Sequence, residues 1–280
     1  MEGLHVGAMA ARPKLGQNFL RDTQAAARIA AALGDLGGQT VIEIGPGRGA
    51  ITGMLAARAG HVIAIEVDRE LAAGLRAQFP LQRVTVVEQD VLRFDFAAAA
   101  AQAGSRLRVA GNLPYYITSP ILLKLAASHA ALDIAVLMVQ REVAERVTAA
   151  PGSRDYGLLS VTVQMHGPAE PLFTLPPAAF SPPPQVNSTV FRWRFAPRFA
   201  QLGVEESGFL RLARQSFAQK RKTLANNLRA AGIAPAAVVG AMRQAGIDAR
   251  ARAETLPLEA LAALWRALAA ESTGTKGEYA

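Results

Sequence analysis

The sequence predicts an α/β protein: a mainly parallel sheet with helices on both faces, followed by a small all-helical C-terminal domain. Between residues 40 and 140, short apolar runs rich in β-branched residues alternate with helical patterns, which is typical of such a sheet. Beyond Pro197 only helical patterns remain. At 280 residues, with 51% hydrophobic and 19% charged residues, the chain is long enough for two domains. We expect them at 12–197 and 198–270, with flexible ends at 1–11 and 271–280.

The first elements in the order of the chain are a helix and five strands. A helical pattern covers residues 23–33 and ends at Gly34. The five predicted strands cover residues 40–45, 61–67, 83–90, 108–112 and 134–140. Ligands of such sheets bind beyond the carboxyl ends of the strands, so the loops that follow these runs are where we expect functional residues.

After residue 140 the alternation of strands and helices changes. A helix is predicted to end near Pro151, and two runs, 158–167 and 188–195, have the alternation of strands. A proline-rich stretch, 171–186, separates the two runs, so we expect them to add antiparallel strands to one edge of the sheet. The C-terminal helices are predicted within 206–232, 234–246 and 257–270, each bounded by Gly or Pro.

The net charge of the chain is unevenly distributed. The formal net charge is +8, and residues 190–230 hold nine Lys and Arg side chains against only Glu205 and Glu206. A basic surplus suits a polyanion, because Lys and Arg displace counterions from phosphates. A solvated helix face is the alternative reading of such a charge run. Aromatic side chains interleave with these charges, so a nucleic-acid-binding face stands as an equal reading. The aromatic residues are Phe191, Trp193, Phe195 and Phe217, and the RNA-binding candidates are Arg214, Lys220, Arg221 and Lys222.

Other features of the composition exclude several classes of protein. The chain has no cysteine, which excludes disulfides and thiolate chemistry. Its four histidines, at positions 5, 61, 129 and 166, have no paired spacing, so we predict no metal site. No segment approaches the apolar length of a membrane span. We therefore expect a cytoplasmic protein that acts without a membrane or a metal, and as a monomer.

A glycine-rich loop, "VIEIGPGRGAIT", follows the first of the five strands and opens a helix. Gly45 and Gly47 allow a tight turn and close approach to a ligand. The spacing Gly45-x-Gly47-x-x-Ala50 fits a dinucleotide-binding fingerprint. The spacing Glu43-x-Gly45-x-Gly47-x-Gly49 equally fits the first motif of S-adenosylmethionine-dependent methyltransferases. The loop alone does not decide between the two cofactors, and a plain strand-to-helix turn is the third reading.

Two acidic residues follow the next two strands. Glu66, in "IAIEVD", can accept hydrogen bonds from a ribose diol, whereas Asp68 fits a helix cap. Asp90, in "VVEQDV", can accept from an adenine amino group. Together with the glycine loop, Glu66 and Asp90 place candidate cofactor contacts at the ends of three consecutive strands.

The fourth strand ends in Asn112-Leu113-Pro114-Tyr115, which matches the Asn/Asp-Pro-Pro-Tyr/Phe motif of enzymes that methylate exocyclic amino groups. The lone pair of an adenine amine is delocalised into the ring, so the amine is a poor nucleophile. The Asn112 side-chain oxygen and a main-chain carbonyl of Leu113 or Pro114 can accept its two hydrogens and localise that lone pair. Tyr115 can stack on the base. These residues are the predicted catalytic corner.

At this point the chain closely resembles the small-subunit ribosomal RNA adenine dimethyltransferases. The similarity covers most of residues 12–265. Its segments are "KLGQNFL", "EIGPGRGAIT", "IEVDREL", "EQDVL", "NLPYYITSPIL", "QREVAERV", "YGLLSV", "FSPPPQVNSTV" and "FAQKRKTLANNL". The resemblance implies a Rossmann-like methyltransferase domain with a helical C-terminal domain. It further implies transfer of four methyl groups from S-adenosylmethionine to two adjacent adenosines of 16S rRNA during late assembly of the small ribosomal subunit.

The resemblance also implies roles for residues outside the corners. Asn18 and Leu20 would contact the cofactor from the N-terminal segment, and Phe180 would offer an aromatic face to the flipped base. Gln185 stands where the family commonly has lysine, which puts its contacts in doubt.

Three other functions remain open at this stage. A large-subunit rRNA methyltransferase that confers macrolide resistance shares the Asn-Leu-Pro-Tyr corner, but "FSPPPQV" and "FAQKRKTLANNL" favour the small subunit. An assembly factor would bind immature subunits, with methylation secondary. An NAD-dependent dehydrogenase is disfavoured, because no His or Lys stands at the fourth strand end.

Overall fold

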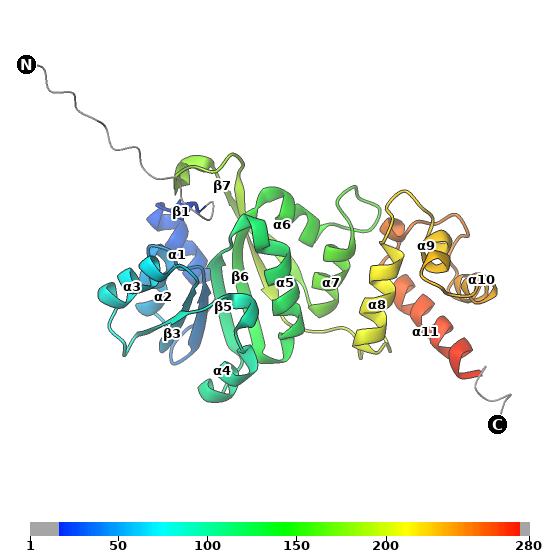
Figure 1. Cartoon of the computed structure of the whole chain (residues 1–280), viewed down its shortest axis with the longest axis horizontal. Coiled ribbons are helices and arrows are strands. Elements are labelled where there is room, and N and C mark those ends of the chain that lie inside the picture. Colours follow the sequence, from blue (N-terminus) through cyan, green and yellow to red (C-terminus); the bar gives the residue numbers. More distant parts are fainter. Residues whose placement is uncertain (1–16, 275–280) are drawn as a thin grey trace, which may run out of the picture.

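A seven-stranded sheet forms the centre of the larger part of the chain (Figure 1). The computed structural model describes residues 17–274. Within them the strand order is β4-β3-β2-β5-β6-β9-β7, and the first five of these strands are parallel. The strands are β2 (Thr40–Ile44), β3 (His61–Glu66), β4 (Val84–Glu88), β5 (Leu107–Asn112), β6 (Leu132–Gln140), β7 (Ala169–Leu175) and β9 (Ser188–Arg194). The five strands predicted before residue 140 are thus confirmed.

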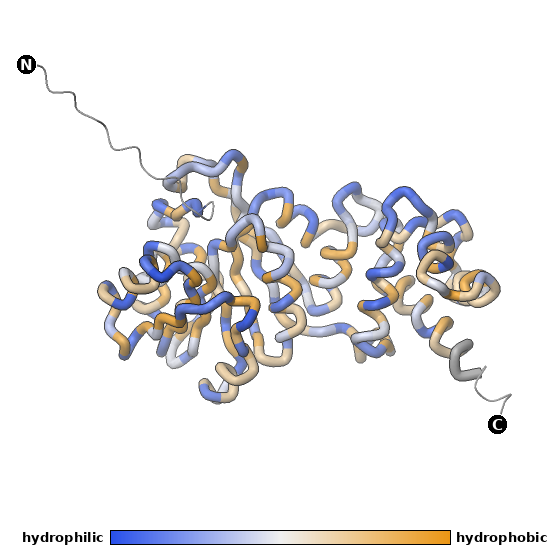
Figure 2. Tube along the Cα trace, in the orientation of Figure 1, coloured by the Kyte–Doolittle hydropathy of each residue, from blue (hydrophilic) through white to orange (hydrophobic). Residues whose placement is uncertain are grey.

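Helices cover both faces of this sheet, as the sequence predicts. On one face, α1 and α2 bury Ile29 and Leu55 in a shared cluster with the sheet. On the other face, α4 and α5 bury Phe96 and Leu122. The helices of this part are α1 (Thr23–Ala32), α2 (Ala50–Ala56), α3 (Arg69–Gln78), α4 (Phe96–Ala103), α5 (Thr118–Ala127), α6 (Arg141–Thr148) and α7 (Leu158–His166). Figure 2 shows hydrophobic stretches along the central strands and hydrophilic stretches in many outer loops.

The predicted strand 158–167 is wrong, because this segment forms helix α7. Its alternating Val-Thr-Val sequence favours a strand by propensity. Helix α7 is buried on nearly all sides, however, so its side chains carry no polar stripe that would indicate a helix. Val163 packs in the sheet cluster, and Val161 packs in the cluster of the C-terminal helices. The Thr162 hydroxyl donates to the Leu158 carbonyl at 2.8 Å, which accommodates a β-branched polar residue inside the helix.

The second antiparallel strand at this edge of the sheet is β7. It lies mostly within the proline-rich stretch 171–186, which we expected to separate two strands. Strand β7 pairs antiparallel with β9, and β9 pairs antiparallel with β6. β7 is the edge of the sheet, where a proline costs no ladder hydrogen bond on its open side. The register shifts between Pro171 and Phe173. The predicted antiparallel addition is therefore confirmed, but with β7 in place of 158–167.

The C-terminal part consists of helices that pack on one another and on α7 (Figure 1). They are α8 (Glu206–Ser216), α9 (Leu224–Ala230), α10 (Pro235–Gln244) and α11 (Leu258–Gly274). Residues 217–223 are not helical, so the predicted continuous helix 206–232 is interrupted. Thr223 caps α9 by accepting from the Asn226 amide. The predicted flexible end 1–11 lies outside the described residues, and α11 continues into the range 271–274 where we expected a loose tail.

The aromatic residues that we expected on a nucleic-acid face lie mostly in the core. Phe191, Trp193 and Phe195 are at most 3% exposed and belong to the sheet cluster. They alternate with charges because only one face is buried at the end of β9, as expected for a strand of period two. Nor are all the nearby arginines free, since Arg192 pairs with Glu170 and Arg198 pairs with Glu259. The aromatic part of the prediction is therefore wrong.

Candidate functional site

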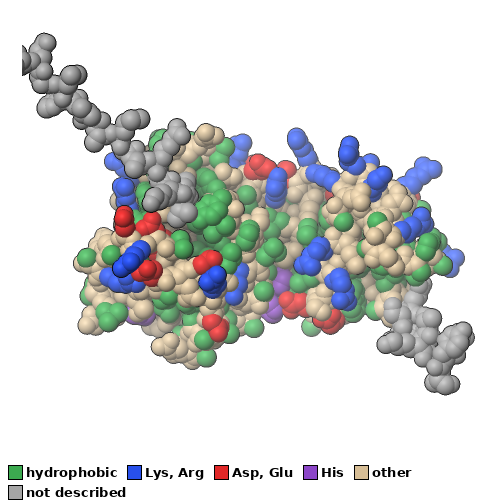
Figure 3. Space-filling view, in the orientation of Figure 1, with side chains coloured by type: hydrophobic (Ala, Val, Ile, Leu, Met, Phe, Trp, Pro, Cys, Tyr) green, Lys and Arg blue, Asp and Glu red, His purple; other side chains and the backbone are tan. Residues whose placement is uncertain are grey.

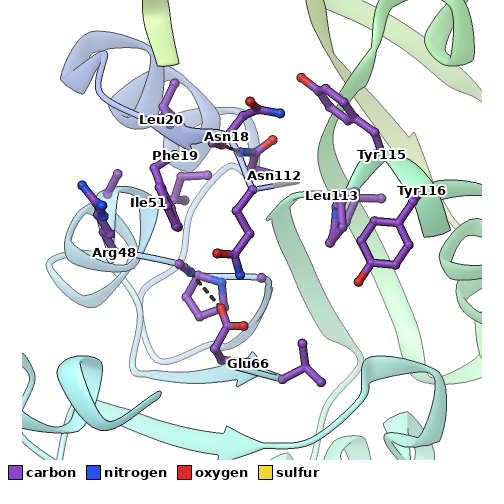
Figure 4. Close-up of a pocket in the computed structure, with 17 residues that line it drawn as sticks. Asn18, Phe19, Leu20, Arg48, Ile51, Glu66, Asn112, Leu113, Tyr115 and Tyr116 are labelled. Carbon is purple, nitrogen blue, oxygen red and sulfur yellow. Dashed lines mark hydrogen bonds between the residues drawn. The ribbon is translucent and has the colours of Figure 1, made fainter. Parts of the chain in front are cut away.

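The strand order reverses direction between β2 and β5, and the candidate site lies at this switch point. β2 pairs with β3 on one side and with β5 on the other, so the loops after β2 and β5 diverge and leave a crevice. A pocket opens there (Figure 4), and its lining includes Gly45, Glu66 and Asn112. The sheet thus brings together three residues that the sequence separates by as many as 67 positions.

The glycine loop makes the floor of this pocket. Gly45 and Gly47 have φ angles of 65° and 56°, which L side chains rarely adopt. A Cβ at Gly47 would lie 2.9 Å from the Phe19 ring, and one at Gly45 would lie 3.5 Å from the Asn112 carbonyl oxygen. A side chain at Gly47 would therefore displace the Phe19 ring, which also lines the pocket, and a side chain at either position would strain the main chain.

Glu66 stands at the end of β3 with its carboxylate oriented by two main-chain amides. Oε2 accepts from the Gly47 amide at 3.1 Å (Figure 4). Oε1 accepts from the Asp68 amide at 3.0 Å. Each carboxylate oxygen has a second lone pair, so both oxygens can still accept a hydroxyl. Asp68 itself caps α3 through the Glu70 and Leu71 amides, as the sequence predicts.

Asn112, the last residue of β5, presents an oxygen that has no partner in the described part of the chain. Its Nδ2 donates to the Asn18 carbonyl at 2.9 Å, which ties the N-terminal segment to the corner. Its Oδ1 is buried without a hydrogen-bond partner and belongs to a residue that lines the pocket. A buried orphan acceptor is costly unless a ligand supplies a donor. The geometry therefore suits an amino group bound beside Asn112.

The rest of the Asn-Leu-Pro-Tyr corner is held by main-chain and hydroxyl contacts. The Pro114 carbonyl accepts from the Ile117 amide and the Thr118 hydroxyl, so it closes a turn. The Leu113 carbonyl is therefore the better candidate for a substrate hydrogen. The Tyr115 hydroxyl lies 2.6 Å from the Ser188 hydroxyl, which fixes its ring at the pocket. Burial raises the pKa of Tyr115, and the hydrogen bond with Ser188 opposes this shift.

Other predicted site residues lie around this pocket, and three of them do not line it. Asn18 and Leu20 are lining residues at β1 (Phe19–Leu20), as the resemblance implies. Phe180 is 3% exposed, pairs opposite Leu20 in the short sheet of β1 and β8 (Phe180–Ser181), and packs in the hydrophobic cluster with α1. Glu43 is 1% exposed beneath the loop, and Asp90 caps a short turn by accepting from the Leu92 amide.

Sequence reasoning missed several lining residues, among them Phe19, Arg48, Val67 and Tyr116. The Arg48 guanidinium lies 4.5 Å from the centroid of the Phe19 ring, and both side chains line the pocket (Figure 4). Val67 and Tyr116 are 55% and 60% exposed there. An apolar residue directly after Glu66 and a second tyrosine after Tyr115 were signals that exposed apolar surface follows these strand ends.

The fold is that of a Rossmann-like methyltransferase, with a pocket at the switch point of its sheet. The profile of the ribosomal RNA adenine dimethylase family matches residues 8–269. The chain belongs to this family and is an rRNA adenine dimethyltransferase.

The similar curated proteins include two that are both named "Ribosomal RNA small subunit methyltransferase A". The protein of Acidobacterium capsulatum is 61% identical over 92% of this chain and 91% of its own length. The protein of Koribacter versatilis is 49% identical over 92% of this chain and 95% of its own length.

Two solved structures share the fold over both parts of the chain. A dimethyladenosine transferase from Plasmodium falciparum has a TM-score of 0.76 and 21% identity, and covers 92% of this chain and 98% of its own. The 23S rRNA methyltransferase ErmE has a TM-score of 0.68 and 26% identity, and covers 90% of this chain and 100% of its own. The predicted α/β fold with a helical C-terminal part is thus confirmed.

Proposed function

We propose that the chain dimethylates the exocyclic amino groups of two adjacent adenosines near the 3′ end of 16S rRNA, late in small-subunit assembly. The orphan Asn112 Oδ1 at the switch-point pocket is the observation that carries the chemistry. The small-subunit substrate is supported by the names of the relatives that are 61% and 49% identical, whereas the structure titled as a 23S rRNA enzyme is 26% identical.

The residues of the pocket fit S-adenosylmethionine. Glu66 would accept from the ribose hydroxyls. Asp90 lies outside the pocket lining but next along the carboxyl edge of the sheet, where it would accept from the adenine amine of a cofactor that extends to it. Gly45 and Gly47 would let the cofactor approach the main chain, and Leu20 would pack against it. When bound, S-adenosylmethionine supplies an electrophilic methyl group. Glu43 would not contact the cofactor, because it is buried beneath the loop and does not line the pocket.

The catalytic corner would prepare the amine for attack. Asn112 Oδ1 and the Leu113 carbonyl would each accept one of its hydrogens, which localises the nitrogen lone pair in the pocket. Pro114 fixes the direction of the Leu113 carbonyl, and Tyr115 would stack on the base. The proton leaves only after the nitrogen has become cationic, so no general base is needed early. Phe180 would reach the base only if the β1–β8 pair moved, since it is buried here.

The basic residues near the end of α8 and in the segment between α8 and α9 would hold the surrounding RNA. Arg214, Lys220, Arg221 and Lys222 are exposed, and Figure 3 shows Lys and Arg side chains over the C-terminal helices. The structure shows no ion pair for these four among the described residues, so their charges are available to phosphates. The Lys220 ammonium donates to the Arg154 carbonyl at 3.0 Å, which places the loop against the α6–α7 connection.

We also propose a cytoplasmic, metal-independent reaction by a monomer, with the domain boundary near residue 198. The described residues include no helix that could cross a membrane.

Methyl transfer to ribosomal subunits from a strain that lacks this modification tests the function. We expect tritiated methyl groups to enter small subunits only, with the methylated nucleotides mapped by primer extension to two adjacent adenosines of 16S rRNA. Incorporation into large subunits would instead identify a large-subunit enzyme.

A further inference from the structure

Two histidines that are distant in the sequence meet a glutamate at the junction of the two parts of the molecule. His129 begins the short turn η3 (His129–Ala131), His166 ends α7, and Glu206 begins α8. His129 Nε2 lies 3.2 Å from Glu206 Oε2, and His166 Nε2 lies 3.2 Å from Glu206 Oε1. The three possible ligand atoms all lie within 4.8 Å of one another. Figure 3 shows a histidine surface beside acidic side chains at this junction.

The hydrogen bonds of His166 turn a lone pair toward the glutamate. Its Nδ1 lies 2.7 Å from the Thr162 carbonyl, which can only accept, so Nδ1 carries the proton. In the neutral ring Nε2 is then an acceptor, and it faces a carboxylate oxygen that is also an acceptor. Two acceptors at 3.2 Å need a proton or a cation between them.

The surroundings match those of a metal ligand. An imidazole whose Nδ1–H donates to a main-chain carbonyl is oriented with Nε2 free, as in most metal-binding histidines. The His166 side chain is 1% exposed. Its ring centroid lies 5.1 Å from that of Phe199 and 6.5 Å from that of Trp193, so aromatic rings shield this side of the site from water. Glu206 and His129 side chains are 37% and 23% exposed, which leaves an entry path and room for a water ligand. Arg106 contacts His129 only at its carbonyl oxygen, at 3.5 Å.

We propose that His129, His166 and Glu206 form a divalent transition-metal site, best suited to zinc, that joins the sheet-bearing part to the C-terminal helices. Two imidazole nitrogens and a carboxylate are ligands that zinc takes at about 2.0–2.2 Å. A small rotation of the more exposed His129 would bring the three atoms to these distances. The ion would connect η3, α7 and α8, which carry residues of both parts, and would fix the position of the basic segment after α8.

Zinc retention by the untagged full-length chain tests the site. The protein is treated with chelator, incubated with zinc sulfate, desalted, and analysed for zinc by mass spectrometry. We expect about one equivalent of zinc per chain, together with a higher Tm in zinc than in chelator. Cobalt(II) added in place of zinc should give visible absorption bands of a site with nitrogen and oxygen ligands.

Two variants and a control make the result specific. His129→Gln and Glu206→Gln should lose the zinc and the rise in Tm, whereas His61→Gln should keep both. His61 bonds to Thr85 at the far end of β3 and shares no contact with the cluster. Circular dichroism verifies that each variant is folded. The proposal is wrong if the parent chain retains no zinc, or if both folded variants retain as much as the parent. Zinc binding without a change in Tm would contradict the joining role.

Discussion

Asn112 is the residue on which the proposed chemistry depends most. Asn112→Ala removes the oxygen that would accept a hydrogen of the adenine amine. We expect the rate of methyl transfer to fall about a hundredfold or more, by analogy with other preorganised polar groups at reacting centres. The affinity for S-adenosylmethionine, measured by calorimetry, should change little, because Glu66 and the glycine loop remain in place. Tritiated-methyl incorporation into undermethylated small subunits measures the rate.

A control asparagine separates this effect from a general loss of structure. Asn226 is exposed in the first turn of α9, far from the pocket lining. Asn226→Ala should methylate at the parental rate. A parental rate in Asn112→Ala as well would contradict the assignment of the corner.

Glu66 should matter for cofactor binding and less for turnover at saturation. Glu66→Gln keeps the shape of the side chain but replaces one charged acceptor with an amide donor. Hydrogen bonds to a charged group are worth roughly 1.5–3 kcal/mol, so we expect the Kd for S-adenosylmethionine to rise about tenfold to a hundredfold. Calorimetry measures this constant.

The neighbouring carboxylate Asp68 supplies the matched comparison. It caps α3 and does not line the pocket. Asp68→Asn should lower the free energy of unfolding by about 1 kcal/mol or less and leave the Kd unchanged. Equal loss of affinity in both variants would argue against a ribose contact at Glu66.

The same residues show how far the sequence predicts the site. Asn112 and Glu66 were predictable because they follow strands, and parallel strands end at one edge of the sheet. How deeply a side chain is buried is harder to predict than its place at a strand end. Phe180 and Glu43 are buried by packing partners that come from other segments, α1 for Phe180 and α2 for Glu43. His129 and His166 meet only because η3, α7 and α8 pack together, so their spacing in the chain gives no signal.

Among the elements, the basic segment between α8 and α9 makes a distinct prediction about RNA. Neutralising Arg221 and Lys222 together should weaken binding to small subunits. It should also reduce the salt dependence, with the log–log slope lower by about 1.4 at most if each side chain contacts one phosphate. Filter binding at several salt concentrations measures both.

Arginines that are already paired provide the comparison. Replacing Arg192 and Arg198, which pair with Glu170 and Glu259, by glutamine should affect the salt slope less. An unchanged slope in the Arg221/Lys222 variant would remove this segment from the RNA interface.

The sequence predicts a helix or a strand correctly where the apolar residues of a segment have one clear period. It fails where both faces of the segment are buried, because the contrast between polar and apolar positions is then lost. The parallel strands have apolar runs bounded by turns, and all five were found. Helix α7 is buried between two cores, so Val161 and Val163 both look like core residues of a strand. Strand β7 contains Pro171, which only an edge position tolerates.

Considered as a whole, the molecule has a second core that extends beyond the predicted boundary near 198. This core joins Val161 and Met165 of α7 to Leu212, Leu228 and Leu261 of the C-terminal helices. Helix α7 therefore belongs by sequence to the first part and by packing to both. We infer that the basic segment and the pocket are held in a fixed relation by this shared helix.

The stability of the whole chain should depend on pH through one buried acid. Burial raises the pKa of Glu43 from 4.5 to about 8, and Glu66 adds to this effect while Thr52 opposes it. Between these two values the folded chain keeps a proton that the unfolded chain releases. The free energy of unfolding should therefore fall as the pH rises through this window. Each pKa unit corresponds to about 1.4 kcal/mol, so the fall amounts to at most a few kcal/mol.

Glu43→Gln keeps a neutral side chain of the same shape at every pH, so this fall should be absent from its unfolding curve. Urea denaturation of the parent and the variant at several pH values across the window measures the difference between the two free energies. The variant should be the more stable of the two at the upper end and close to the parent at the lower end. The exposed Glu70, replaced by glutamine in the same way, should leave the parental pH dependence intact. Parallel curves for the parent and Glu43→Gln would mean that Glu43 is ionised in the folded chain, with a cation or a water-filled path to compensate its charge.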